Sequence, residues 1–475
     1  MPLILASNSA SGGYNVANSL RFNSASSDNL SRTPSASNRK TWTFSTWIKF
    51  TRTGSNQGLL VAGASYTEFG YLGIKIGNGD YFDVGMGTGI FRRTTQLFRD
   101  VSAWYHFVVG FDTTQATASD RVKVYVNGSQ ITDFSISNNP TLNTDYGLNS
   151  NALTTVGRNS ESAGEYFNGY MAETYYIDGQ QLTPSSFGQT DPSVPSSGIW
   201  QPKAYTGTYG TNGFYLQFKN SASLGTDSSG NGNTFTVNNL TSVDQSTDTC
   251  TNNFSTLNLL ANNEVPNGNT FSYSDGALTF KGSAGTDTSQ MMTVGTQAVS
   301  TGKWYWEAKL ISVGSDIPGI GILNTEANFN VQNAYPHNSS VSAYGYTYMS
   351  NGQKSNNGTD AAYGTSYTTG DIIGIALDMT NNKLYFSKNG TFQNSGDPTS
   401  GATGTGAAYT VQSALTYFPA CNLRFYPSAG EWSFNFGSPS YAANSYTDGA
   451  GFGNFSYAVP SGYYSLNTKN LANFG

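Results

Sequence analysis

The side chains best suited to acid–base or nucleophilic chemistry are few in this chain of 475 residues, which contains only two histidines. His106 lies in "WYHFVV" and His337 in "AYPHNSS". A histidine base needs a positioned partner, yet the chain offers no Ser-His-Asp arrangement and no GxSxG elbow. Because aromatic residues flank His106 on a predicted strand, we interpret it as a partly buried structural histidine.

Paired carboxylates would suit glycoside hydrolysis, in which two Asp or Glu groups face one sugar. A strand would supply them two or four residues apart, and no such arrangement occurs on a predicted strand. Glu161 and Glu165 are four apart in "NSESAGEYFNG", but this stretch is typical of a loop before a strand. Phosphate-binding glycine loops are also absent. The sequence therefore predicts no catalytic residue, no cofactor-binding residue and no enzymatic activity.

The sequence gives little support for metal binding or for thiol chemistry. Cys250 and Cys421 are the only cysteines, which excludes a disulfide framework and a cysteine zinc site and favours two free or buried thiols. Asp227, Asn231 and Asn233 share a loop whose oxygens could bind calcium. That loop has a single carboxylate, and Asn, Asp and Gly are common in turns, so a plain turn is the favoured interpretation and calcium stays open.

Composition narrows the class of protein. The chain is 14% aromatic and only 11% charged, with 31 Tyr, 28 Phe and 54 Gly, which favours an almost entirely β structure. A net charge of −6 without basic blocks predicts no nucleic-acid partner. No apolar run is long enough for membrane insertion, and "MPLILASNSASGG" lacks the features of a secretory signal. A virion component made in the host cytoplasm would reconcile these features with a polar, charge-poor surface.

The first of two predicted domains occupies residues 1–188 and consists of short strands with polar turns. In "WTFSTWIKF", the alternate residues from Trp42 to Phe50 share one face. The pair Asn127-Gly128 in "VNGSQ" predicts a tight hairpin turn. Strands at this spacing predict a sandwich of two antiparallel sheets.

The order of "FSTWIKF", "WYHFVVGFD", "DRVKVYVNGSQI" and "GYMAETYYIDGQQLTPSSFG" resembles the laminin G-like, concanavalin-type jelly roll. The resemblance covers most of residues 14–188. It implies a terminal strand in Gly169–Gly188 and a short helical turn after Leu182-Thr183-Pro184.

Residues 189–266 are predicted to form an irregular connector, rich in proline and small residues. Within it, "GFYLQFKNSASLGTDSSGNGNTF" partly repeats "NSLRFNSASSDNL", which predicts a returning strand. A second echo joins Thr251–Asn262 to Ser461–Gly475. We therefore expect residues 441–475 to be a tail that packs on a domain or on a neighbouring subunit.

The second predicted domain covers residues 267–440. Its motifs "GKWYWEAKL", "GIGI", "GDIIGIALDMTNNKLYFSKNG", "YFPA" and "SFNFG" resemble, in this order, the SPRY (B30.2-type) β-sandwich. In the long motif, "MTNN" predicts the turn of a hairpin. Buried positions on its two strands are predicted at Ile373, Ile375, Leu377, Leu384 and Phe386. The fold class expected for the chain is all-β, with two antiparallel jelly-roll-type sandwiches and a connector.

Contact with a partner is expected from loops rich in Tyr, Asn, Ser and Gly. Tyr344, Tyr346 and Tyr348 alternate and so share one face, which is either an inward face of the sandwich or a platform for a sugar or partner. Tyr81 and Phe82, in the predicted loop "GDYFDVGMGTGIFRR", are the contact candidates in the first domain.

Taken together, the laminin G-like domain, the connector and the tail "SLNTKNLANFG" resemble structural proteins of tailed phages, in particular those of marine cyanobacterial and related phages. The resemblance implies a non-enzymatic tail fibre, appendage or capsid decoration protein. Its expected partners are other virion proteins, further copies of itself, and a host-surface glycan or protein. A bacterial surface adhesin or carbohydrate-binding protein is the alternative, and a glycan-degrading enzyme on a concanavalin-like fold is the third.

Overall fold

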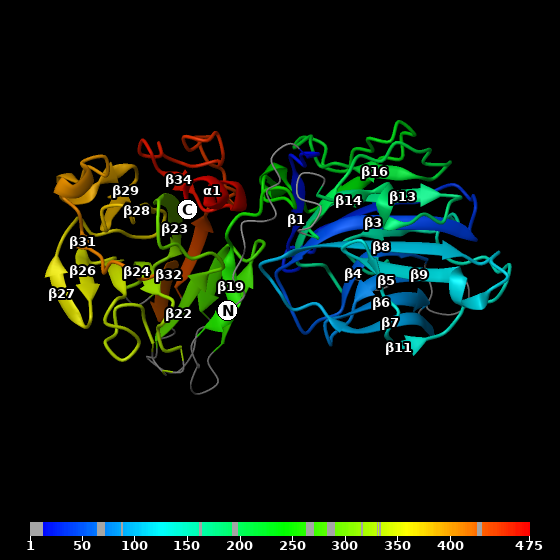
Figure 1. Ribbon diagram of the computed structural model, residues 1–475, viewed down its shortest axis with the longest axis horizontal. Helices are drawn as coiled ribbons and strands as arrows, with labels where there is room; N and C mark the ends of the chain where they lie inside the picture. The colour runs from blue at the N-terminus through cyan, green and yellow to red at the C-terminus, as the bar shows by residue number, and fades with distance from the viewer. Residues whose placement is uncertain are drawn as a thin grey trace. The chain divides into compact units, whose positions relative to one another are not determined.

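A computed structural model describes residues 13–63, 72–86, 89–160, 164–191, 198–262, 270–282, 290–314, 317–329, 331, 334–424 and 430–475. The chain forms two compact units, each with its own pair of facing sheets (Figure 1). The first unit ends at Asn253 and the second begins at Phe254. The all-β expectation is confirmed.

The N-terminal unit is a sandwich of sheet 1 and sheet 2. Sheet 1 consists of β10 (Ser129–Gln130), β9 (Val122–Val126), β8 (Trp104–Asp112), β3 (Thr41–Phe50), β13 (Gly169–Asp178), β1 (Ser19–Phe22) and β18 (Gln245–Ser246), with β16 (Phe214–Leu216) also paired to β13. Sheet 2 consists of β11 (Phe134–Ser137), β7 (Gly89–Leu97), β6 (Tyr81–Met86), β5 (Leu72–Ile76), β4 (Gln57–Ala62), β12 (Thr154–Val156), β2 (Asn29–Arg32) and β17 (Thr236–Asn238). Separate from both are β14 (Gly188–Thr190) and β15 (Trp200–Pro202), and the described residues also form the 3-10 turns η2 (Ala118–Arg121), η3 (Pro184–Ser186) and η5 (Ser242–Asp244).

Alternation along β3 builds the core between sheets 1 and 2. Trp42, Phe44, Ile48 and Phe50 are buried there, as the period of two predicts. The predicted turn at Asn127-Gly128 joins β9 to β10 with φ values of 47° and 83°, the left-handed conformations that such two-residue turns require. The predicted strand and helical turn near residue 184 are also present, as β13 and η3.

The predicted returning strand is β16. It pairs with Thr174–Tyr176 of β13, whereas β1 pairs with Gly169–Met171 of the same strand. The echo in the sequence thus marks two segments that pair with successive halves of one strand. The boundary predicted at residue 188 differs from the observed one, because the chain up to Asn253 returns to the N-terminal unit through β16, β17 and β18.

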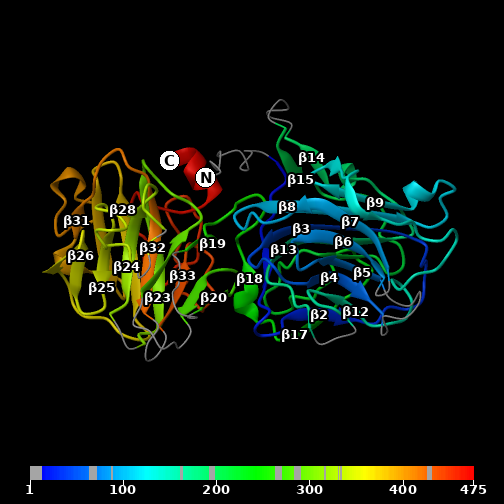
Figure 2. The same cartoon turned by 90° about the horizontal axis from the view of Figure 1, so that it is seen from below.

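The C-terminal unit is a second sandwich, of sheet 3 and sheet 4. Sheet 3 consists of β19 (Leu257–Asn262), β22 (Gln290–Gly295), β32 (Tyr417–Arg424), β24 (Gly319–Asn324), β25 (Tyr346–Met349), β26 (Gln353–Asn356) and β27 (Thr359–Ala362). Sheet 4 consists of β20 (Phe271–Ser274), β21 (Thr279–Gly282), β33 (Glu431–Asn435), β23 (Lys303–Ser312), β28 (Ile372–Asp378), β29 (Lys383–Lys388) and β30 (Thr391–Phe392), with β31 (Tyr409–Thr410) paired to β29 and β34 (Tyr464–Ser465) to β23. The helical elements are η6 (Gln393–Ser395), η7 (Gly401–Thr403) and α1 (Thr468–Phe474). Figure 2 shows β23 and β33 side by side, as their pairing requires.

The predicted hairpin is formed by β28 and β29. Asp378 pairs with Lys383, so the four residues "MTNN" make the turn. The five apolar residues predicted on its inner face are all fully buried in the core between sheets 3 and 4.

The tail packs on the C-terminal unit. In Figure 1 it is the red segment with β34 and α1, and β34 pairs in parallel with β23. The two segments of the second echo lie side by side in the structure, since Phe254 and Asn467 form a β-bridge and the Ser255 amide donates to the Leu466 carbonyl at 2.9 Å.

Candidate functional site

His106 lies on the outer face of sheet 1, away from the sandwich core, and is enclosed there. Its ring stacks on Trp47 with centroids 4.8 Å apart. The indole N–H of Trp200 donates to Nδ1 at 2.9 Å, and Nε2 lies 2.8 Å from the Ser45 hydroxyl. Because an indole nitrogen can only donate, Nδ1 carries no proton and Nε2 is the protonated nitrogen. This tautomer cannot accept the Ser45 proton at Nε2, so the pair is not a nucleophile and its base.

We expect the His106 imidazole to remain neutral, with its proton on Nε2, between about pH 5 and pH 8. Burial lowers its pKa to about 3. Nitrogen-15 NMR of histidine-labelled protein checks this, and His337, whose pKa burial lowers to about 4, should be equally silent. A His106 titration midpoint within that range, or a proton on Nδ1, would contradict the assignment.

Glu173 occupies a bulge in β13. The pairing of β13 with β3 shifts register between Ala172 and Tyr175, and Glu173 has a φ of 49°. A bulge adds one residue and re-aims a side chain. Here the carboxylate accepts hydrogen bonds from three tyrosine hydroxyls, at 3.1 Å from Tyr14, 2.6 Å from Tyr175 and 2.7 Å from Tyr215. Glu173 therefore links β13 to its neighbouring strand β16 and to the N-terminal segment at Tyr14.

Burial raises the pKa of Glu173, against the effect of the tyrosine hydrogen bonds. The folded protein thus retains this proton to a higher pH than the unfolded chain, and the stabilisation that the proton supplies is complete only below the unfolded pKa of about 4.3. We expect the stability of wild type relative to Glu173→Gln to fall as pH rises from about 4 and then to level off. Thermal denaturation of both proteins at four pH values tests this. A relative stability that rises with pH would contradict it.

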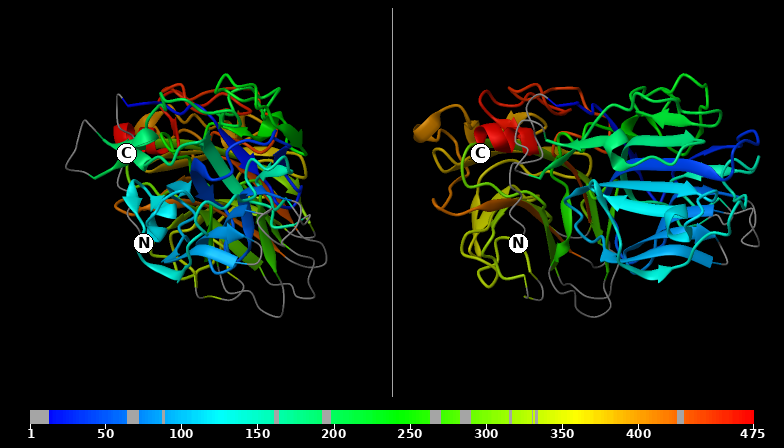
Figure 3. Two further views of the ribbon diagram at one scale, coloured as in Figure 1. Left: turned by 90° about the vertical axis from the view of Figure 1, so that its right-hand side faces the viewer. Right: turned by 45° about the vertical axis from the view of Figure 1, so that its right-hand side comes forward.

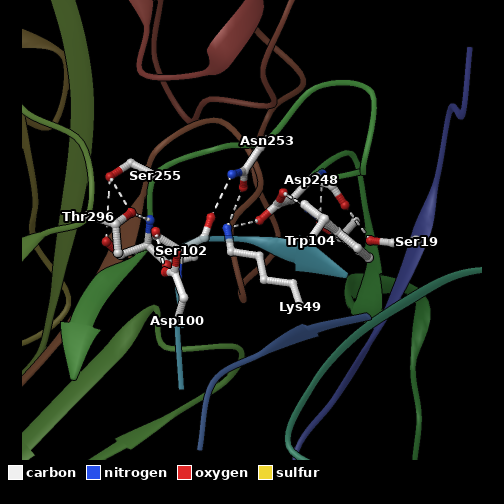
Figure 4. A network of polar contacts seen from close by, with 11 residues as sticks. Ser19, Lys49, Asp100, Ser102, Trp104, Asp248, Asn253, Ser255 and Thr296 are labelled. Atoms are coloured by element: carbon white, nitrogen blue, oxygen red, sulfur yellow. Dashed lines mark hydrogen bonds and ion pairs between the residues drawn. The ribbon is translucent and has the colours of Figure 1, made fainter. Parts of the chain in front are cut away.

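A buried ion pair fixes the end of the N-terminal unit (Figure 4). Nζ of Lys49 lies 2.8 Å from Oδ2 of Asp248 and donates to Oδ1 of Asn253 at 2.7 Å. The Trp104 indole donates to Oδ1 of Asp248 at 3.2 Å, and the Ser19 hydroxyl donates to its carbonyl oxygen. Both charged side chains are almost completely inaccessible. Burial lowers the pKa of Lys49, and the Asp248 carboxylate opposes that effect.

Glu307 is the buried carboxylate that holds the tail in the C-terminal unit. It lies on β23, on the face of sheet 4 that points away from the core, and is fully buried. Its carboxylate accepts the backbone N–H groups of Ser456 and Tyr457 at 2.9 Å each, and side-chain hydrogen bonds from Tyr305 and Asn435 at 3.1 Å. Burial raises its pKa, against the effect of these hydrogen bonds. The tail is therefore held by a carboxylate of the sheet that it covers.

The aromatic contact candidates are mostly inside the fold. Tyr346 and Tyr348 lie on β25 and pack in the core between sheets 3 and 4. Tyr344 precedes the strand and is 39% exposed. The inward-face interpretation describes Tyr346 and Tyr348, because a period-two run on a sheet that faces a second sheet is buried. A shared tyrosine platform is ruled out.

The predicted loop with Tyr81 and Phe82 is a hairpin of β6 and β7. Phe82 is fully buried and stacks on Phe107 with centroids 4.5 Å apart. Tyr81 is partly exposed and lies under the Arg93 guanidinium, 4.0 Å from its ring centroid. The loop prediction was wrong, because the glycines and Asp83 hid the apolar–polar alternation that is typical of a strand. In the structure Asp83 is a strand residue that pairs with Arg93 on the neighbouring strand.

The calcium candidates form a hydrogen-bonded turn. The Asp227 carboxylate accepts the backbone N–H groups of Tyr215, Ser229 and Asn233 and the Ser229 hydroxyl. Asn231 donates its amide to the Gly210 and Gly213 carbonyls. Asn233 donates to Thr211 and Gly213, and its side-chain oxygen accepts from Arg32 at 2.6 Å. These hydrogen bonds hold the loop as a turn. Among the described residues no group of three His, Cys, Asp or Glu able to hold a metal occurs, and calcium binding by this loop stays a prediction.

The two cysteines are enclosed, and Glu165 is partly buried. Cys250 and Cys421 are buried and unbridged, and burial raises both thiol pKa values. Glu165 accepts from Asn159 and Lys75 at 2.9 and 3.1 Å, whereas Glu161 lies outside the described residues. None of the described helices is long and apolar enough to cross a membrane.

An open concavity lies at one edge of the N-terminal sandwich, where sheet 1 ends at β10 and sheet 2 at β11. We call it the edge groove. It has a volume of about 560 Å³, within the range of about 300–1,000 Å³ for small-ligand sites. Its lining residues are Thr95, Gln96, Val126, Asn127, Ser129, Gln130, Ile131, Thr132 and Asp133.

Sequence reasoning did not find Glu173, Glu307, the Lys49–Asp248 pair or the edge groove. A signal was present for the two glutamates, since each is an acid in the interior of an apolar, aromatic strand, "GYMAETYYID" and "KWYWEAKLIS". The ion pair joins positions 199 residues apart, and nothing in local spacing indicates such a contact.

Each unit of the chain is a β-sandwich of two sheets, and the first carries the open edge groove. Residues 23–186 match the family described as "Concanavalin A-like lectin/glucanases superfamily", and residues 303–439 match the family described as "SPRY domain". The chain thus contains an N-terminal laminin G-like domain and a C-terminal SPRY domain.

Relatives are similar over short stretches. Ran-binding protein 9 of Danio rerio is 36% identical over 90 residues, which cover 19% of this chain and 14% of that protein. The Drosophila melanogaster ATP-dependent RNA helicase Ddx1 is 29% identical over 154 residues, 32% of this chain and 17% of that protein. The chain therefore spans less than a fifth of the length of these relatives.

Two solved structures are also similar to part of the chain. The SPRY domain of human HERC1 covers 38% of this chain and 96% of that chain, with 15% identity and a TM-score of 0.28. A putative carbohydrate binding protein from Bacteroides ovatus covers 36% and 46%, with 18% identity and a TM-score of 0.27.

Proposed function

We propose that this chain is a non-enzymatic recognition protein of a virion, a tail fibre, appendage or capsid decoration that contacts a host-surface glycan or protein. It assembles with further copies of itself and with other virion proteins. Many weak contacts multiplied by copy number would give firm attachment.

The observation that carries the proposed recognition role is the burial of the side chains suited to acid–base chemistry. His106, Glu173 and Glu307 are buried. Segments that cover the outer face of a sheet engage His106 and Glu307, and tyrosine hydroxyls, one of them from the neighbouring strand β16, engage Glu173. A general acid or base must reach the proton that it transfers. The open concavity of the first sandwich is instead lined with amides and hydroxyls, groups that serve recognition.

The virion assignment is supported by the likeness of the connector and the tail to structural proteins of tailed phages. Immunogold electron microscopy of particles made from the genome that encodes this chain tests it, with particles that lack the gene as the control. Labelled particles are expected, and unlabelled particles would overturn the virion assignment. Incubation of the purified chain with host polysaccharide tests the enzymatic alternative, since released reducing ends would overturn the non-enzymatic assignment.

A further inference from the structure

We propose that the edge groove is the glycan-binding site of this protein and that its ligand is a neutral oligosaccharide. This inference rests on the proposed role in host-surface recognition. It assigns to the groove a ligand class that follows from the lining residues, their exposure and their charge.

The groove is formed where two sheet edges meet. β10 is the last strand of sheet 1, β11 is the last strand of sheet 2, and Ile131–Asp133 connect them. Figure 3 shows the strands of this unit mainly in blue and cyan. The segment with Phe187, Tyr205 and Tyr209 packs on the face of sheet 1 that is turned away from sheet 2, whereas β16 is itself a strand of sheet 1. The covering segment lies against that outer face, and the edge with β10 and β11 keeps its concavity.

The lining presents hydrogen-bonding groups that the fold does not use. Gln96, Ser129, Gln130 and Thr132 are exposed, and none of their side chains hydrogen-bonds within the described residues. Amides and hydroxyls both donate and accept, which matches sugar hydroxyls, since these also do both. The partly exposed side chain of Ile131, also in the lining, offers an apolar surface for the C–H groups of a sugar ring, whereas Val126 belongs to the core beneath.

The charge of the lining favours a neutral sugar. It contains no lysine or arginine, and its one ionisable side chain is Asp133, whose carboxylate accepts from the Thr95 hydroxyl at 2.8 Å. A carboxylated or sulfated sugar would meet one like charge and no cation. A neutral sugar is not repelled by the Asp133 carboxylate and needs no cation as a partner.

The strand geometry disfavours an added peptide strand. β10 has only two residues, and the pairing of β11 with β7 is interrupted between Phe134 and Ile136. Short and bulged edges oppose the continuous backbone pairing that such recognition needs.

Isothermal titration calorimetry of the full chain tests the site with neutral tetrasaccharides of glucose, mannose, galactose and xylose, and with tetrasaccharides of alginate as the anionic comparison. Ser129→Trp places a large ring in the groove, and Ser129→Ala is the matched control at the same exposed position. We expect wild type to bind at least one neutral tetrasaccharide and to bind alginate more weakly. Ser129→Trp should lose roughly tenfold or more in affinity, and Ser129→Ala less than about threefold.

A second pair of variants keeps the test independent of the tryptophan. Gln96→Ala combined with Gln130→Ala removes two free amides and should weaken binding roughly tenfold, whereas Gln412→Ala, an exposed glutamine of the C-terminal unit, should not change it. If wild type binds a neutral tetrasaccharide and neither groove variant weakens it, the groove assignment is overturned and glycan recognition stands. Stronger binding of alginate overturns the neutral ligand class. If wild type binds none of these sugars, recognition of a glycan and the groove assignment both fail.

Discussion

Replacing Asp248 with alanine is expected to destabilise the N-terminal unit by about 3–5 kcal/mol, because it leaves the Lys49 ammonium buried without its carboxylate. The pair is 2.8 Å apart, with 0% and 2% of the two side chains exposed. The Trp104 indole also loses its acceptor. Burying a charge without a partner is among the most destabilising single changes.

Native-state hydrogen exchange of the full chain measures this loss unit by unit. Peptides of β3 and β13 should lose protection, and peptides of β28 should not, so the C-terminal unit is an internal control. Lys49→Met combined with Asp248→Ala removes both charges and should recover much of the stability. Asp120→Ala breaks the more exposed pair with Lys123 and should cost less than about 1 kcal/mol.

An Asp248→Ala protein whose β3 and β13 peptides keep wild-type protection would contradict the assignment of a charged, buried pair. A double variant no more stable than Asp248→Ala alone would place the loss in the indole and amide contacts instead.

Replacing Glu307 with glutamine is expected to destabilise the C-terminal unit by about 2–4 kcal/mol. Each carboxylate oxygen accepts one backbone N–H and one side-chain donor. Whichever oxygen becomes the amide nitrogen, it faces a backbone N–H that cannot reverse its polarity, and that buried donor loses its acceptor. Hydrogen exchange of tail and β23 peptides measures the effect.

Glu173→Gln is the matched control for this experiment. Its carboxylate accepts only from hydroxyls, and a hydroxyl can rotate to accept from an amide instead. We expect a loss below about 1 kcal/mol at neutral pH. Equal losses in the two variants would show that the polarity of the donors does not set the stability of the covering segments.

Local pattern predicts the strands of both sandwiches well. The β28–β29 hairpin and the Asn127-Gly128 turn follow from alternation and turn chemistry, and each is formed by residues adjacent in sequence. The run Tyr344–Tyr348 shows the limit, because alternation places residues on one face without saying whether a second sheet covers that face. For Tyr346 and Tyr348, sheet 4 does.

The site depends on contacts that sequence spacing does not encode. The bulge at Glu173 is invisible in "GYMAETYYID", since one added residue leaves a plausible alternation. The edge groove joins residues near 96 and 130, and their proximity follows from the order of strands in two sheets. A pattern of polar surface residues does not reveal which of them surround a hollow.

The segments that lie outside the family matches also determine where recombination can join parts of this gene without disrupting a sandwich. The family matches end at residues 186 and 439, but the tyrosine of β16 that binds Glu173 and the two amides that bind Glu307 come later, at Tyr215, Ser456 and Tyr457. A recombinant joined at the family limits would lack β16 of sheet 1 or the segment that covers sheet 4, and it would present a buried glutamate to solvent. Exchange near residue 253 keeps all strands and covering segments of each sandwich together. The segment that must be inherited intact is therefore longer than the segment that matches the family.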